Sequence, residues 1–227
     1  MKHCILPTLF SALSLYSTGA LAQLPPNTVA HQDSSKWNSE IAAFEAADKT
    51  NAPPEHCIVF VGSSSIRLWS TLKSDFPDLP VVNRGFGGSE IADAVKLADR
   101  IIIPYAPREV VIYSGGNDIA NGKDPALVFG DFVALVDALQ RHLPSVRIAY
   151  IASAPNPSRW AMVDKVKKLN SLVRAFCDDH SLMFIDVFPL MLGPDGLPKP
   201  DIFRDDRLHM NAKGYDIWKQ AVRPYLK

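Results

Sequence analysis

The chain has 227 residues, and its 24 basic residues balance its 24 acidic ones. This balance leaves no excess of positive charge for nucleic acid or for an anionic membrane surface, so we expect a small or neutral molecule as the partner. The length suits one domain with a substantial core, and the sequence assigns no oligomeric state.

The first 22 residues have the three parts of a secretory signal peptide. Lys2 precedes an apolar stretch, and the segment ends in Ala20-Leu21-Ala22, a small-x-small pattern that signal peptidase accepts. Serine and threonine interrupt the apolar stretch, so no stable membrane insertion is expected. The alternative, an amphipathic first helix of the domain, accounts for fewer of these features. We therefore expect an exported protein, periplasmic or secreted, that is cleaved near Ala22.

Residues 23–56 are expected to form a polar lead-in and one helix, because Trp37, Ile41 and Phe44 have helical spacing within residues 37–47. Short apolar runs and longer amphipathic stretches then alternate through residues 57–227. The apolar runs are typical of strands buried on both faces and cover residues 57–61, 81–82, 110–113, 147–151 and 182–187. The amphipathic stretches are predicted helices and cover residues 90–103, 125–143, 160–180 and 212–225. The alternation predicts a parallel sheet in a three-layer α/β/α sandwich.

The cysteines and glycine motifs indicate neither a metal nor a cofactor. Cys4 belongs to the signal segment, while Cys57 and Cys177 lie in apolar segments where a buried thiol and a disulfide are equally compatible with the pattern. Cysteine pairs with metal-ligand spacing are absent from the sequence, as is a His-x-x-x-His pair. A dinucleotide fingerprint would need a glycine where Glu90 stands, and the chain has no Gly-Lys-Ser/Thr phosphate loop.

Three loops that follow predicted strands contain candidate site residues. In an open parallel α/β sheet, ligands bind beyond the carboxyl ends of the strands, so these loops should share one rim. Ser64, in the run GSSS, can project a hydroxyl from a strand-to-helix turn. The glycines around Gly88 permit backbone N–H groups to point at a ligand, and Asn117, in the run GGND, carries an amide that can donate to an oxyanion. Taken alone, each motif is better explained by a helix cap or a tight turn than by a catalytic role.

A fourth motif, DRLH, lies just before the last predicted helix. Its spacing of three residues places Asp206 and His209 on one side of a helical turn, so that the carboxylate can hold one ring nitrogen while the other faces a nucleophile. Among the histidines after the signal segment, only His209 has an acid at this offset, whereas His142 and His180 end predicted helices. Together the four motifs supply a nucleophile, a base, an acid that orients the base, and donors for an oxyanion.

The four motifs resemble those of the SGNH (GDSL-type) hydrolases. Ser64, Gly88, Asn117 and His209 match the four namesake residues in order, Asp206 matches the acid, and the tail DRLHMNAKGY is similar to the closing motif of that family. The resemblance extends from about residue 57 to the C-terminus. It implies a five-stranded parallel sheet of flavodoxin-like type, no cofactor, and hydrolysis of esters or thioesters through an acyl-enzyme. It further implies an oxyanion hole made of the Ser64 and Gly88 N–H groups and the Asn117 side chain.

One position departs from that family, which has Asp where this chain has Ser63. The strand sequence VFVG sets the register and makes Ser64 the expected nucleophile rather than Ser63 or Ser65. The segment 153–160 follows the fourth predicted strand and should form a wall of the pocket, with Arg159 and Trp160 as the expected substrate contacts or, alternatively, as rim packing.

The sequence therefore predicts a serine hydrolase for short-acyl, acetyl or lysophospholipid-type carboxylic esters, acting on a small-molecule or carbohydrate ester without a metal. Two alternatives remain open at this stage. An envelope O-acyltransferase would use the same triad and differ only in the access of acceptor and water. A catalytically inactive carbohydrate-binding module would share the fold but would have no need of all these chemical groups.

Overall fold

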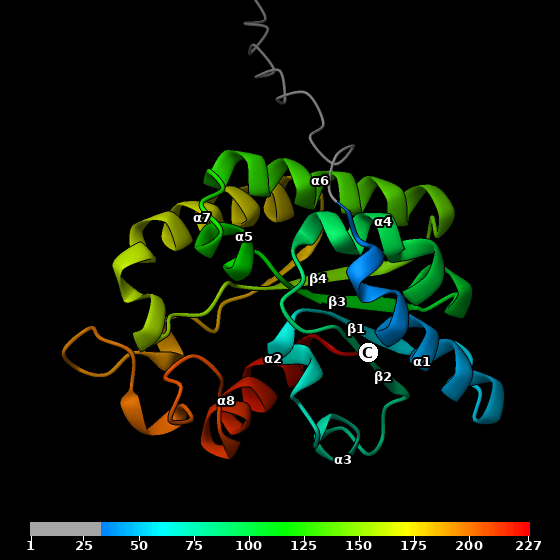
Figure 1. Cartoon of the computed structure of the whole chain (residues 1–227), viewed down its shortest axis with the longest axis horizontal. Helices are drawn as coiled ribbons and strands as arrows, with labels where there is room; N and C mark the ends of the chain where they lie inside the picture. The colour runs from blue at the N-terminus through cyan, green and yellow to red at the C-terminus, as the bar shows by residue number, and fades with distance from the viewer. Residues whose placement is uncertain (1–32) are drawn as a thin grey trace, which may run out of the picture.

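A five-stranded parallel sheet divides the molecule into two helical layers (Figure 1). The computed structural model describes residues 33–227, so the predicted signal peptide lies outside the described residues. The strand order is β2-β1-β3-β4-β5, and the strands are β1 (Ile58–Gly62), β2 (Val81–Gly85), β3 (Glu109–Tyr113), β4 (Arg147–Ile151) and β5 (Met183–Ile185). The predicted three-layer α/β/α fold with a five-stranded parallel sheet is confirmed.

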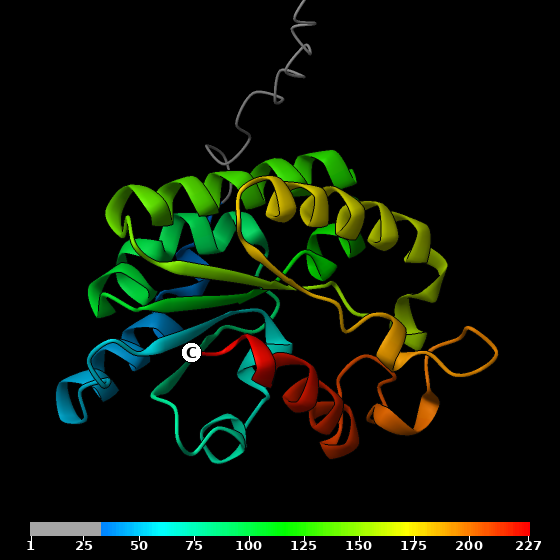
Figure 2. The same ribbon diagram turned by 180° about the vertical axis from the view of Figure 1, so that it is seen from behind.

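The helices cover both faces of this sheet, as the two opposite views show (Figures 1 and 2). One layer contains α4 (Ile91–Ile101), α6 (Pro125–His142) and α7 (Val163–Asp179), with the short α5 (Gly116–Ala120) beside them. The other contains α2 (Ser64–Arg67), α3 (Leu72–Asp75) and α8 (Ala212–Val222). Every residue of β1 is buried between these layers, which explains its unbroken apolar run.

Local chemistry determines where the helices near the rim begin. Asp124 caps α6 by accepting a hydrogen bond from the Ala126 N–H at 2.8 Å, and Pro125 follows as the first helical residue. Asn211 caps α8 in the same way, accepting from the N–H groups of Lys213 and Gly214. Because Asn211 stands two residues after His209, this cap also ends the loop that carries the histidine.

The first helix, α1 (Asn38–Thr50), packs beside α4 at the β2 side of the sheet. Arg84 of β2 binds it through the Asp48 carboxylate, with 2.5 Å between Nη2 and Oδ1. Tyr105 completes the cluster, because its hydroxyl donates to Asp48 at 2.7 Å and accepts from Arg84 Nε at 2.8 Å. The lead-in helix is therefore anchored by a partly buried, charge-assisted network.

The strand register brings the loops after β1, β2 and β3 to one level. Gly62, the last residue of β1, is paired with Gly85 of β2 on one side and with Tyr113 of β3 on the other. A side chain at Gly62 would place its Cβ 1.9 Å from the Tyr113 carbonyl oxygen, so only glycine permits this close approach. The three loops with candidate residues consequently leave the sheet side by side.

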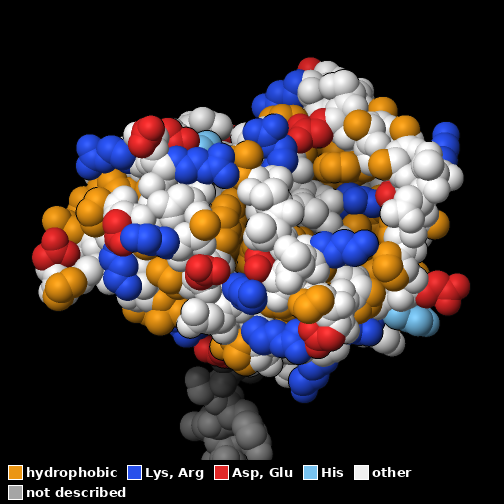
Figure 3. Space-filling model, turned by 90° about the horizontal axis from the view of Figure 1, so that it is seen from below, with side chains coloured by type: hydrophobic (Ala, Val, Ile, Leu, Met, Phe, Trp, Pro, Cys, Tyr) orange, Lys and Arg blue, Asp and Glu red, His pale blue; other side chains and the backbone are white. Residues whose placement is uncertain are grey.

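The surface carries mixed charge. On the face seen from below, basic and acidic side chains are interspersed (Figure 3). Among residues 33–227, none of the helices combines the length and hydropathy that a bilayer span requires.

Cys57 and Cys177 are both buried and free. Of the two alternatives that the sequence left open for them, a free thiol and a disulfide, the structure therefore shows the free thiol.

Candidate active site

Ser64 is the first residue of α2, directly after the strand-to-helix turn that ends β1. The turn is closed by the Ser63 N–H, which donates to the Tyr113 carbonyl at 3.2 Å, and by the Ser63 carbonyl, which accepts from two N–H groups of α2 at 3.1 Å. On the other side, Tyr215 of α8 donates its hydroxyl to the Ser65 carbonyl at 2.9 Å. The serine is thus held by β3 and α8 as well as by its own strand.

His209 lies within hydrogen-bond distance of this serine, although 145 residues separate them in sequence. The distance from His209 Nε2 to Ser64 Oγ is 2.9 Å, and the distance from His209 Nδ1 to Asp206 Oδ2 is 2.6 Å. This chain of serine, histidine and carboxylate has the connectivity that a general base needs to accept the hydroxyl proton.

The DRLH segment is a non-helical turn, so the expected helical turn at this motif is wrong. Arg207 has φ 55°, in the left-handed region, and the turn is closed by hydrogen bonds between Arg204 and the backbone of Arg207 and His209. The carboxylate and the imidazole still meet, because Asp206 Oδ1 accepts from the N–H groups of both Leu208 and His209 at 2.9 Å. These backbone donors, together with the ring of His209, lower the pKa of Asp206 to about 2.

Asn117 lines the same pocket and belongs to α5, the helix that follows β3. Its Nδ2 donates to the Ser89 carbonyl at 2.9 Å, which joins the loop after β3 to the loop after β2. Gly88 precedes Ser89 in that loop and has φ 75°, a conformation that favours glycine. Gly88 is not among the pocket-lining residues, but Asn117 is hydrogen-bonded to its neighbour Ser89, so two of the three predicted oxyanion donors, Gly88 and Asn117, lie beside each other.

A buried charged cluster lies behind these two loops. Lys123 pairs with Glu90 and Asp131 at 3.0 Å and with Asp118 at 3.4 Å. Asp118, which follows Asn117, also accepts from the Ile91 N–H at 3.3 Å and so joins α5 to the start of α4. Burial raises the pKa of Asp118 to about 7.

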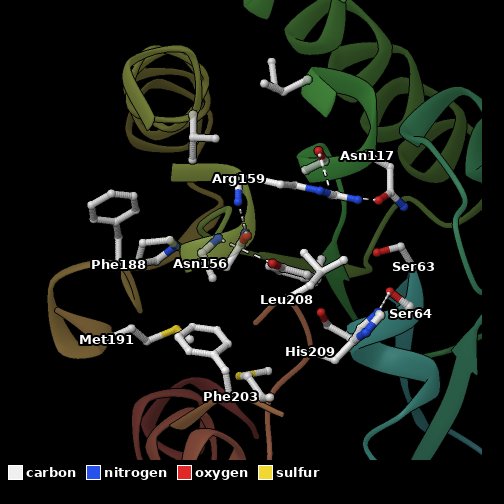
Figure 4. A pocket seen from close by; sticks show the side chains of 18 of the residues that line it. Ser63, Ser64, Asn117, Asn156, Arg159, Phe188, Met191, Phe203, Leu208 and His209 are labelled. Carbon is white, nitrogen blue, oxygen red and sulfur yellow. Dashed lines mark hydrogen bonds between the residues drawn. The ribbon is translucent and has the colours of Figure 1, made fainter. Parts of the chain in front are cut away.

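A pocket of about 730 Å³, counted to its open mouth, extends from Ser64 and His209 between α7 and the segment 188–203. Figure 4 shows Ser64 and His209 on one side of it and Phe188, Met191 and Phe203 across from them. Sequence reasoning did not identify these three residues. They belong to the segments after β5, and the rule that loops beyond the strand ends form the site would have indicated the first of these segments.

Arg159 and Trp160, the two expected substrate contacts, both line this pocket. They come from a 3-10 segment, Pro157–Met162, that precedes α7. The Arg159 guanidinium reaches toward α5, where its Nη1 donates to Asn117 Oδ1 at 3.0 Å and to the Gly116 carbonyl at 3.2 Å (Figure 4). The sequence did not predict this contact between the two loops.

The model of the GDSL-like lipase/acylhydrolase family matches residues 57–217. The chain belongs to this family. The resemblance read from its motifs is thereby confirmed, and so is the general assignment as a hydrolase that acts on esters. No curated protein matches the chain.

Solved structures of GDSL-like proteins share the fold at low sequence identity. A GDSL-like lipase from Bacteroides thetaiotaomicron is 21% identical, with a TM-score of 0.68, over 85% of this chain and 96% of that one. A lipase/acylhydrolase from Enterococcus faecalis is 20% identical, with a TM-score of 0.61, over 75% and 97%. An acetyl-xylooligosaccharide esterase from Geobacillus is 18% identical, with a TM-score of 0.62, over 74% and 93%. At these identities the likeness shows the fold alone.

Ser63 occupies the position at which this chain departs from the GDSL-like pattern. Its side chain is buried and makes no hydrogen bond to cap α2. The turn around the candidate nucleophile is instead closed by backbone bonds from Ser63 and by Tyr215. These contacts account for the ordered turn without an acid at this position.

Proposed function

We propose that this protein hydrolyses carboxylic esters through an acyl-enzyme formed on Ser64. The observation that carries the proposal is the hydrogen-bonded chain from Ser64 through His209 to Asp206, which opens into a pocket. His209 Nε2 takes the proton of the Ser64 hydroxyl as Oγ attacks the ester carbonyl carbon, and the same nitrogen then protonates the leaving alcohol. Water repeats the cycle on the acyl-enzyme, releasing the acid and restoring the Ser64 hydroxyl. Asp206 holds the proton-bearing Nδ1 and stabilises the imidazolium.

The oxyanion of the tetrahedral intermediate is bound, in this proposal, by the N–H groups of Ser64 and Gly88 and by the Asn117 side chain. The hydrogen bond from Asn117 to the Ser89 carbonyl supports this assignment, because it holds the amide beside the Gly88 loop. Donors fixed before the reaction stabilise developing charge without reorganising, which is the main source of catalytic power in such sites.

The pocket chemistry favours an ester with an apolar acyl part several carbons long. Of the described residues that line the pocket, none is Asp or Glu, whereas its lining includes a set of apolar side chains: Val163, Val166, Phe188, Met191, Phe203 and Trp218. A sugar needs several polar partners, while an alkyl chain gains about 0.8 kcal/mol for each buried CH₂. We therefore infer that the acyl chain occupies this apolar part and that acetylated sugars are poorer substrates.

The test of this function combines labelling with a substrate series on one preparation. A serine-reactive fluorophosphonate is expected to label the wild type and the variants Ser63→Ala and Ser65→Ala, while Ser64→Ala stays unlabelled and loses nearly all turnover. Labelling of Ser64→Ala with no labelling of Ser63→Ala would show that the nucleophile is Ser63. Absence of labelling in the wild type would contradict the serine-hydrolase assignment.

In the same preparation, kcat/KM for p-nitrophenyl esters is expected to rise about fourfold for each CH₂ from acetate upward until the pocket is full, as the burial energy predicts. Acetylated xylooligosaccharides serve as the competing substrate class. A higher kcat/KM on these sugars than on the butyryl or hexanoyl ester would reject the apolar acyl site while leaving the serine mechanism intact.

A further inference from the structure

The side chain of Asn117 has two partners that determine which way its amide faces. Its Oδ1 accepts from Arg159 Nη1 at 3.0 Å, and its Nδ2 donates to the Ser89 carbonyl at 2.9 Å. A guanidinium has only donors and a backbone carbonyl has only acceptor positions. A flipped amide would place its NH₂ group against the guanidinium and its oxygen against the carbonyl, so only one orientation satisfies both partners.

This orientation leaves a hydrogen for the reaction. The amide nitrogen carries two hydrogens, and the Ser89 carbonyl takes one of them. Asn117 and Ser64 line the same pocket, and in the proposed mechanism the second hydrogen is the one donated to the substrate oxygen bound next to Ser64. A residue without a side-chain hydrogen-bond donor in place of Arg159 would remove the group that selects this arrangement.

The guanidinium also adds positive charge behind the donor. Arg159 is half-buried, and burial lowers the pKa of its guanidinium, yet an arginine stays protonated in proteins. A charge-assisted bond to Oδ1 polarises the amide and makes its N–H groups stronger donors. The benefit is greatest when negative charge develops on the substrate oxygen, which occurs in the transition state and not in the neutral ester.

The backbone next to Arg159 is hydrogen-bonded to the loop that carries His209. The Arg159 N–H donates to Asn156 Oδ1 at 2.9 Å, and the Ser158 N–H donates to the Arg207 carbonyl at 3.0 Å. The segment Pro157–Met162 thus contacts the loop of His209 through its backbone and Asn117 through one side chain. Displacement of this segment would therefore shift both the loop of the proposed general base, His209, and the proposed oxyanion donor, Asn117.

We propose that Arg159 is a positioning residue that acts on the reaction through Asn117, holding and polarising its amide, and that it is not primarily a substrate-binding residue. This inference rests on the proposed ester hydrolysis at Ser64. It predicts that replacing Arg159 lowers kcat to a similar extent for acyl chains of every length and leaves KM nearly unchanged.

A double-mutant cycle tests this coupling. Arg159→Met keeps an unbranched stem and removes the donors, and it is expected to lower kcat about tenfold or more, but by no more than the roughly hundredfold to thousandfold loss typical of a missing oxyanion donor. In the Asn117→Ala background the same change is expected to cost less than about twofold, because the group that Arg159 acts on is gone. Arg159→Lys, which retains one charged donor, is expected to recover part of the lost kcat.

Trp160→Leu is the matched control, because Trp160 neighbours Arg159 and lines the pocket but makes no hydrogen bond to Asn117 in the described structure. The fold-loss in kcat/KM caused by Trp160→Leu is expected to multiply with the loss caused by Asn117→Ala, because the two residues act independently. Trp160→Leu is also expected to change KM or the preference for acyl-chain length. Melting temperatures of all variants separate these effects from a loss of folded protein.

Two results would overturn the positioning role. Fully multiplicative losses in the Arg159→Met/Asn117→Ala double variant would show that Arg159 acts independently of Asn117, and a rise in KM confined to some substrates would show direct substrate binding. A readout without turnover is the side-chain amide resonance of Asn117 in ¹⁵N-labelled protein, which Arg159→Met is expected to shift and Trp160→Leu to leave in place. If the wild type proves inactive on every ester, the proposed function fails, and an unshifted resonance rejects the positioning role separately.

Discussion

At the residue scale, Asp206 shows how one carboxylate can close a loop and also hold the ring of His209, the proposed general base. Its Oδ1 accepts hydrogen bonds from two backbone N–H groups and its Oδ2 faces His209 Nδ1, so these three hydrogen bonds all join Asp206 to residues at most three positions away. Its pKa is lowered to about 2, and the stabilisation linked to it is therefore present above the ordinary value of 3.8 and is lost only as the pH falls through about 2. Asp206 remains ionised wherever the folded enzyme is expected to work.

Asp206→Asn tests this orienting role with little change of shape. The Asn oxygen can still accept from the backbone of Leu208 and His209, but its NH₂ group would face Nδ1 and impose the tautomer with a proton on Nε2. That nitrogen could then no longer accept the proton of Ser64. We expect kcat to fall by about 10⁴-fold, as for the corresponding amide in a serine-protease triad, with the melting temperature nearly unchanged. A fall of less than about tenfold at pH 7 would contradict the tautomer argument.

The residue scale also shows what the sequence could predict. The pair Asp206 and His209 was predictable because three residues separate them and a local turn decides their contact. The bond from Arg159 to Asn117 was not, because it joins loops 42 residues apart whose approach depends on the packing of the segment before α7. The expectation that Arg159 lies at the pocket holds, but its partner could only be identified from three-dimensional geometry.

At the element scale, the buried cluster behind α5 links the two loops that carry the predicted oxyanion donors. Asp118 of α5 accepts from the Ile91 N–H at the start of α4, and Lys123 joins Asp118 to Glu90 and Asp131. Three carboxylates around one ammonium leave an excess of buried negative charge, so protonation of one carboxyl relieves it. Burial is the main cause of the raised pKa of Asp118, the charge of Glu90 adds to it, and the Lys123 ammonium opposes it.

Asp118→Asn should change how stability depends on pH. The folded protein holds the Asp118 proton up to about pH 7, whereas the unfolded chain releases it near 3.8. Between these values the folded state binds more protons, so its stability falls as the pH rises, and the contribution is constant above pH 7. The melting temperature of the variant relative to wild type should therefore rise by roughly 5 °C between pH 5 and pH 8.

The exposed Asp137→Asn on α6 is the control for this measurement, and its melting temperature should keep a constant difference from wild type. Parallel curves for Asp118→Asn and wild type would show that Asp118 is not the group that titrates. The amide oxygen of Asn can still accept from the Ile91 N–H, so the variant is expected to fold.

The bounds of helices and strands could be predicted from the sequence where the apolar pattern is strong, but not where it is weak. The helix predicted at residues 125–143 is observed as Pro125–His142, and the strand predicted at 147–151 is observed with the same bounds. The short helices α3 and α5 were not predicted, and α2 was indicated only by the strand-to-helix turn at Ser64, since four or five residues carry no measurable apolar period. The pocket wall in residues 188–203 was missed for the same reason, because it consists of 3-10 turns and irregular chain.

At the scale of the whole molecule, the strand order explains how distant segments make one site. The loops after β1, β2 and β3 leave adjacent strands, and the loop before α8 returns the C-terminal part of the chain to the same rim. Parallel sheets place all such loops at one edge, so this much of the site was predictable from the alternation of strands and helices. Which loops contact one another was predictable only where the family resemblance named the residues.

Export is a further expectation for the whole molecule, and the buried cysteines are compatible with it. Burial raises the pKa of the Cys177 thiol to about 12 and also raises that of Cys57, which keeps both thiols protonated and unreactive. Residues 33–227 contain no disulfide, so a reductant is expected to leave the melting temperature of this domain unchanged. Cys4 would be removed with the signal segment.

We propose that export cleaves the chain after Ala22, which would leave residues 23–32 ahead of the first described residue. Expression of the full sequence in a Gram-negative host should yield, in the periplasmic or secreted fraction, a 205-residue protein (227 − 22) that begins at Gln23, as measured by intact mass. Replacing Ala20 and Ala22 by Gln removes the small side chains that signal peptidase requires, so this variant should keep its full length and stay with the membrane fraction. A wild-type protein recovered from the cytoplasm with residues 1–22 attached would contradict the export prediction. The esterase assignment would be unaffected, because Ser64, His209 and Asp206 all lie in the described domain.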